Sequence, residues 1–367
     1  MKATKGKYHN QAPALAWLTR RVAPDLSNIA AQCLGSSLSS ASWLQVASVS
    51  RKLAATAKRT NLDLSFPLDE DKVLNTVLAW IGEGLRCSTI RNYLGRLSTL
   101  QTLGGHPPLA KDLLLKRILG GWENTQPESP KRLAVTPAVL FKIHTELQSV
   151  RWSPQKKACF WLVCAVMFAG ALRSCEVLPG GVHTFIGDQT LLPQDISVVT
   201  ETLDGVALTL LKVKIKMPKE GRDGRRVTFI ELFKFDTFFC PIAALATYYR
   251  LCHRNPPCDQ PLVRRQDGGG YTAAQFNLDL KHLLRSTFDY ENDRICSHSF
   301  RAGIPSVLAK NGFSKEIIQA QGRWSGPSYE NYCKLGRGTR LSVQRDVATC
   351  LMKEAHSPML EYLVDEE

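Results

Sequence analysis

The stretch CSHSFRAGIPSVLAKNGFSKEIIQAQGRWSGPSYENY, residues 296–332, carries more chemical information than any other part of this 367-residue chain. It begins with His298 and Arg301, which are three residues apart at the start of an apolar, periodic segment. Residues at this spacing lie on one face of a helix, so both side chains can reach the same phosphate group. The stretch continues to Trp324 and ends at Tyr332.

A second motif lies upstream, where residues 168–176 read FAGALRSCE. An apolar helix is expected to end here in Gly-x-x-Arg, and the arginine, Arg173, is followed three residues later by Glu176. Arginine stays charged at any accessible pH and presents a planar fork of donors to phosphate. Arg173 and Arg301 are therefore suited to neutralise the charge that develops on a phosphodiester under attack.

In their order and spacing, these residues resemble the two sequence boxes of the tyrosine recombinases, also called the phage integrase family. The short interval from Trp324 to Tyr332 resembles the eukaryotic transposon-borne branch, the DIRS-like elements and cryptons. The resemblance covers roughly residues 40–345. It implies a mainly α fold with a small antiparallel β-sheet (α+β), in which a helical core-binding domain and a catalytic domain form a C-shaped clamp around DNA.

The resemblance also assigns roles at the expected reaction centre. Tyr332 would attack the phosphodiester and form a 3′-phosphotyrosine intermediate, which keeps the energy of the broken bond. Arg173 and Arg301 would bind the phosphate, His298 would donate a hydrogen bond or carry a proton, and Glu176 would hold neighbouring groups in place. Trp324 would position the phosphate through its indole N–H, which cannot exchange protons near neutral pH.

Tyr329 competes with Tyr332 as the nucleophile, because it lies one helical turn away. We favour Tyr332, since it follows Asn331 in an Asn-Tyr pair found in some family members and lies at a suitable distance from Trp324.

The family uses a lysine on a β-hairpin as the general acid that protonates the leaving 5′ oxygen. Residues 206–216 predict one strand, residues 221–224 a turn and residues 226–230 the return strand. Lys216, at the end of the first strand, fits this role best, and Lys219 is the alternative. Other lysines of this segment are expected only to touch the DNA backbone.

The composition agrees with a nucleic-acid partner. The chain is 44% hydrophobic and has a formal net charge of +14, as expected for a globular protein attracted to a polyanion. Without a signal peptide or a long apolar run, we expect it to stay inside the cell, in a nucleus if the host is eukaryotic and otherwise in the cytoplasm. The eleven cysteines are odd in number and lack Cys-x-x-Cys pairs, which favours reduced thiols and no metal site.

Five parts can be drawn along the chain. They are a basic, partly flexible arm (1–36), a helical core-binding domain (37–121), a linker with two prolines (122–133), a catalytic domain (134–340) and an amphipathic tail (341–367). The tail could dock on a neighbouring protomer, as in the family, or pack on its own domain.

Periodicity predicts helices near 41–60, 69–84, 88–103 and 110–120 in the core-binding domain, with Asp69 and Ser88 among the caps. The third of these resembles the family's DNA-facing helix. Arg86, Arg91 and Arg96 would then contact DNA, although solvent-exposed charges on a helix explain each of them equally well.

The expected function is therefore site-specific cleavage and rejoining of DNA in integration, excision or transposition of a mobile element. The family resemblance implies a homotetramer on two DNA duplexes, with no metal or nucleotide cofactor. Two alternatives remain open: an enzyme like the type IB topoisomerases, and a DNA-binding protein that descends from a recombinase but has lost catalysis.

Overall fold

The computed structural model describes residues 2–3, 33, 38, 40–109, 112–127, 133–187, 189–203, 205–216, 227–252, 257–285, 294–311, 313–323 and 337–356. The chain divides into two compact units, which we treat separately. The helical unit is Gly6–Ser129, and the mixed unit is Pro130–Glu367 together with Met1–Lys5. Within the ranges above, no helix has the length and apolar character needed to cross a membrane.

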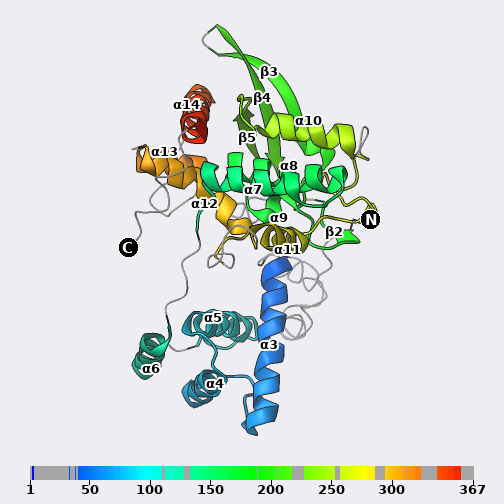
Figure 1. Cartoon of the computed structure of the whole chain (residues 1–367). Helices are drawn as coiled ribbons and strands as arrows, with labels where there is room; N and C mark the ends of the chain where they lie inside the picture. The colour runs from blue at the N-terminus through cyan, green and yellow to red at the C-terminus, as the bar shows by residue number, and fades with distance from the viewer. Residues whose placement is uncertain are drawn as a thin grey trace. The chain divides into compact units, whose positions relative to one another are not determined.

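Amphipathic helices form the helical unit (Figure 1). In its described ranges these are α3 (Ser40–Thr60), α4 (Glu70–Gly82), α5 (Cys87–Leu103) and α6 (Leu113–Thr125). Their apolar faces enclose a core that includes Val77, Trp80 and Ile90. The Trp80 indole donates a 2.9 Å hydrogen bond to Thr56 Oγ1, which satisfies its one buried donor.

The helix ends follow the sequence pattern in part. Asp69 caps α4 as predicted, because its carboxylate accepts a backbone N–H bond of the first turn. Ser88 does not cap α5, which begins one residue earlier and contains it. The helix α6 continues to Thr125 and so extends into the range predicted as linker, 122–133.

The mixed unit contains the remaining named helices. They are α7 (Pro137–Ser149), α8 (Pro154–Ala169), α9 (Ser174–Val177), α10 (Pro241–Leu251), α11 (Ala273–Leu284), α12 (Ser297–Lys310), α13 (Lys315–Gly322) and α14 (Arg337–His356). The helix α8 is central to them, because every residue from Ala158 to Ala169 is buried and α7, α10 and α12 all contact it (Figure 1). A helix that is apolar on all sides needs such complete coverage.

A three-stranded antiparallel sheet completes the mixed unit, with the order β3-β4-β5. The strands are β3 (Ile196–Leu203), β4 (Val206–Ile215) and β5 (Thr228–Phe233). Val213 pairs with Ile196 on one side and Ile230 on the other, and all three are buried. The predicted hairpin is therefore confirmed as β4 and β5, although its turn at 221–224 lies outside the described residues. The mainly helical fold with one small antiparallel sheet agrees with the predicted fold class.

The strand β3 is an addition to the sequence-based prediction. Leu203 pairs with Val206, so the connection from β3 to β4 has two residues, and Gly205 in it has φ +77°. Tight hairpins need residues that tolerate positive φ, and the sequence Asp204-Gly205 is a typical signal for them.

Both ends of the chain contribute to the mixed unit. Near the N-terminus, β1 (Lys2–Ala3) pairs in parallel with β2 (Thr184–Phe185). Near the other end, α14 buries Val343, Val347 and Leu351 in the core of the mixed unit. The described part of the predicted tail thus packs on its own unit.

The close approach of α12 to α8 depends on Gly303. A Cβ atom there would lie 2.2 Å from the Val135 carbonyl oxygen and 2.6 Å from a ring carbon of Phe168.

We predict that Gly303→Ala destabilises the protein by about 3 kcal/mol, because a backbone atom must move. Gly95→Ala, at a helical glycine with open space around it, should instead stabilise by about 0.5–1 kcal/mol. Urea unfolding of both variants measures these changes, and equal stability of the two variants would contradict the close packing.

Candidate active site

The C-terminus of α8 sets the position of the first motif. The Ala171 and Leu172 amides donate back to the Phe168 and Met167 carbonyls, at 3.1 and 3.0 Å, and Ala171 has φ +45°. This is a Schellman ending, in which glycine usually occupies the left-handed position. Left-handed backbone costs another residue about 1–2 kcal/mol. The turn redirects the chain so that Arg173 follows directly.

Arg173 and Glu176 form a compact unit at the start of α9. The Glu176 carboxylate accepts the Arg173 backbone N–H at 2.8 Å and its guanidinium Nη1 at 2.9 Å. Only 4% of the Glu176 side chain is exposed. The Glu176 carboxylate is therefore bound to both the backbone and the side chain of Arg173.

The second motif brings its arginine to the same place. Arg301 on α12 is 2% exposed, and its Nη1 donates to the Ala171 carbonyl oxygen at 2.5 Å. Its Nη2 donates to the Gly322 carbonyl at the end of α13. His298, one helical turn earlier, is exposed. The two predicted catalytic arginines therefore converge on the end of α8, although 128 positions separate them in the sequence.

A third arginine joins them, and sequence reasoning assigned no role to it. Arg323 follows α13 in the left-handed conformation, with φ +51° and ψ +44°. Its Nη2 lies 3.1 Å from Glu176 Oε2 and 3.4 Å from the Ala171 carbonyl oxygen. The available signal was its position in the second motif, directly before Trp324.

The charges of this cluster determine the state of its carboxylate. Burial raises the pKa of Glu176, but the charge of Arg323, the hydrogen bond from the Arg173 amide and the charge of Arg173 together hold it below its usual value. Glu176 is therefore an anion at neutral pH. With three guanidiniums and one carboxylate, the cluster carries an excess of positive charge suited to a phosphate.

The end of β4 reaches the same region. Lys216 lines a small cavity with Glu176, Gln189 and Thr190. Its Nζ forms an ion pair with Asp195 Oδ2 at 2.5 Å, and the two side chains are 16% and 2% exposed. An ammonium has three donors, so the ion pair with Asp195 leaves Lys216 Nζ able to donate to a further acceptor.

The contacts of Lys212, within β4, differ from those of Lys216, which directly follows this strand. The Lys212 ammonium lies between two carboxylates across the sheet, 2.6 Å from Glu201 and 3.7 Å from Glu231. Lys212 therefore forms ion pairs with both neighbouring strands. The alternative acid Lys219 lies outside the described residues, as do Trp324, Tyr329 and Tyr332.

The DNA-contact candidates of the helical unit lie at the N-cap of α5 and along this helix. Arg86 is exposed at its N-cap, and Arg96 is half-buried on the helix. Arg91 is exposed but already forms two contacts with Glu123, at 2.7 and 3.0 Å, and that hydrogen bond raises the pKa of Arg91. Binding of Arg91 to a phosphate would therefore compete with an existing ion pair.

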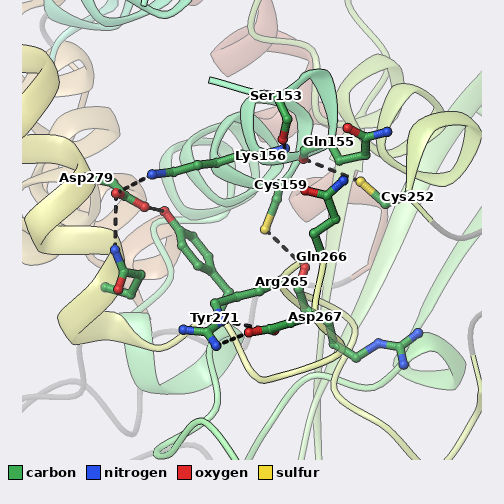
Figure 2. A pocket seen from close by; sticks show the side chains of 12 residues that line it. Ser153, Gln155, Lys156, Cys159, Cys252, Arg265, Gln266, Asp267, Tyr271 and Asp279 are labelled. Carbon is green, nitrogen blue, oxygen red and sulfur yellow. Dashed lines mark hydrogen bonds and ion pairs between the residues drawn. The ribbon is translucent and has the colours of Figure 1, made fainter. Parts of the chain in front are cut away.

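A cavity of about 410 Å³ lies at the opposite end of α8 (Figure 2). Figure 2 shows Lys156 and Tyr271 pointing toward Asp279, which accepts from both at 2.8 Å. Gln275 adds a third donor at 3.2 Å. These polar groups bind one another, and the helix rise places Lys156 about 20 Å from Ala169 at the other end of α8. We therefore assign the chemistry to the arginine cluster.

Similarity to known proteins is found among solved structures. No protein-family model and no curated protein sequence matches the chain. Among solved structures it is similar to the XerH site-specific recombinase bound to palindromic difH substrate in a post-cleavage complex, with 14% identity, a TM-score of 0.50, and coverage of 92% of this chain and 87% of that chain. A fragment of the Tn1549 transposon integrase in complex with circular intermediate DNA has 14% identity and a TM-score of 0.43, covering 91% of this chain and 98% of that chain. A Flpe–Holliday junction complex has 13% identity and a TM-score of 0.38, covering 77% and 76%. The similarity to XerH shows that the two chains share a fold.

The role of Glu176 can be measured through stability. We predict that Glu176→Gln lowers the free energy of unfolding by about 2 kcal/mol at pH 7, because charged hydrogen bonds are lost. Since the folded-state pKa is lowered, this contribution exists above the unfolded pKa of about 4.3 and disappears as the pH falls through the folded value. In urea titrations from pH 7 down to pH 3, the unfolding free energies of wild type and Glu176→Gln should therefore converge.

Asp346→Asn serves as the control for this measurement. Asp346 is 53% exposed and lies 4.0 Å from Arg345, so its removal should change stability by less than about 0.5 kcal/mol. A Glu176→Gln protein as stable as wild type at pH 7 would show that the carboxylate does not hold the cluster together.

Proposed function

We propose that this chain is a tyrosine recombinase, which cleaves and rejoins DNA through a 3′-phosphotyrosine intermediate during integration, excision or transposition of a mobile element. The observation that carries this proposal is the meeting of Arg173 and Arg301 at the Ala171 carbonyl and Glu176. Two motifs far apart in the sequence thus supply guanidiniums to acceptors at the same helix end.

The chemistry of the cluster fits phosphoryl transfer. Attack on a phosphodiester places negative charge on the non-bridging oxygens of a five-coordinate phosphorus. Arg173 and Arg301 would stabilise that charge with fixed donors, without the metal ions that many other phosphoryl-transfer enzymes use. His298, exposed on the first turn of α12, would add a donor or carry a proton.

The nucleophile in this proposal is Tyr332, with Tyr329 as the competitor. Trp324 would pack against the phosphate and donate its indole N–H. Because the covalent intermediate preserves the energy of the broken bond, the strands could be rejoined without ATP.

Lys216 would protonate the leaving 5′ oxygen. It lies at the edge of the Glu176 cavity, whereas Lys212 is held between carboxylates of the sheet. Asp195 would keep the ammonium at this edge until DNA arrives.

The partner in this proposal is double-stranded DNA. The net charge of +14 favours it, and Arg86, Arg91 and Arg96 would contact its backbone or bases from α5. Recombination joins two duplexes, so we propose a homotetramer of the kind that the family forms. Within the family, we propose that the chain is most similar to the DIRS-like and crypton branch.

Covalent trapping tests the proposed reaction. Wild type, Tyr332→Phe and Tyr329→Phe are incubated in EDTA with nicked suicide substrates that include the ends of any mobile element flanking the gene. We expect a denaturation-resistant protein–DNA adduct in wild type and Tyr329→Phe, and none in Tyr332→Phe. An adduct with Tyr332→Phe would refute this nucleophile, and its absence from wild type on DNA that the protein binds would favour a non-catalytic DNA-binding protein.

A sulfur-containing substrate tests Lys216 as the acid. We predict that Lys216→Ala slows adduct formation about a hundredfold or more. When sulfur replaces the bridging 5′ oxygen, the leaving thiolate needs no proton and the variant should approach the wild-type rate. Lys212→Ala is the matched control and should cleave both substrates normally. If Lys219→Ala alone is rescued by sulfur, the acid is Lys219.

A further inference from the structure

We infer that Arg323 is a positioning residue of the reaction centre, which couples Arg173 to Arg301 and adds a third positive charge where the phosphate binds. This inference deepens the proposed function and rests on it. It assigns a role to a residue that the motif analysis left without one.

Arg323 shares one acceptor with each of the other two arginines. Glu176 receives Nη1 of Arg173 on Oε1 and Nη2 of Arg323 on Oε2. The Ala171 carbonyl oxygen receives Nη1 of Arg301 and Nη2 of Arg323. Arg323 therefore connects the two catalytic arginines through these shared acceptors.

The backbone of Arg323 is strained. Arg323 ends α13 at φ +51°, where glycine would be the least strained residue. Strained positions of this kind cluster at active sites. Here the left-handed turn directs the guanidinium back toward the end of α8, which glycine could not supply.

The Arg323 guanidinium is largely buried. The Arg323 side chain is 15% exposed, and its Nε is buried with no hydrogen-bond partner among the described residues. A buried guanidinium donor without an acceptor is costly unless a ligand satisfies it. A phosphate oxygen beside Arg173 would be a suitable acceptor.

The test compares Arg323→Gly and Arg323→Lys with wild type, and uses Arg345→Ala as the control. The glycine variant removes the guanidinium but tolerates the left-handed backbone, so a loss of function cannot come from backbone strain. Arg345 lies in the same unit with a side chain that is 52% exposed. Circular dichroism establishes that each variant folds.

The first readout does not depend on catalysis. It is the rise in melting temperature caused by inorganic phosphate, relative to chloride at equal ionic strength. We expect this rise in wild type and Arg345→Ala, most of it lost in Arg323→Gly, and part of it kept in Arg323→Lys. An undiminished rise in Arg323→Gly, or none in wild type, would overturn the anion-binding role.

The second readout is the rate of adduct formation on the suicide substrate. We expect Arg323→Gly to be slower by about a hundredfold and Arg323→Lys to recover part of that loss. A wild-type rate in Arg323→Gly would overturn the positioning role. If wild type forms no adduct, the proposed reaction fails, while the phosphate measurement still decides whether Arg323 belongs to an anion site.

Discussion

The hydrogen-bond acceptors at the end of α8 constrain the whole candidate site. The Ala171 carbonyl and the nearby Glu176 carboxylate receive guanidiniums from three separate segments of the chain. Burying arginine charges is costly unless their donors are satisfied. Arg301 and Arg323 must therefore meet these acceptors, and this requirement fixes where α12 and the end of α13 lie.

The packing of the core around α8 holds those acceptors in fixed positions. Because α8 is buried from Ala158 to Ala169, its C-terminus cannot shift without disturbing the packing around it. Gly303 lets α12 approach so closely that Arg301 reaches Ala171. A catalytic group held within about 0.5 Å of its working position needs such support. Packing and chemistry thus meet at the same helix end.

Sequence patterns predicted the elements that depend on local preference, such as the hairpin of β4 and β5 and the capped start of α4. The strand β3 was missed although its Asp204-Gly205 turn was readable. Arg323 could not be recognised from spacing, because its direction follows from a left-handed helix ending. Likewise, the ion pair of Lys216 with Asp195 depends on how η2 (Pro193–Asp195) meets β4.

Left-handed backbone at two residues supports the arrangement of the candidate site. Ala171 and Arg323 each adopt a conformation that favours glycine, and the Arg323 side chain contacts the Ala171 carbonyl. Replacing both with glycine would relieve about 1–2 kcal/mol at each position. At Arg323 that gain would remove the guanidinium, and at Ala171 it would loosen the backbone that presents the shared carbonyl. Two adjoining residues therefore stay in left-handed backbone, and in the proposed function this strain fixes the charge that faces the phosphate.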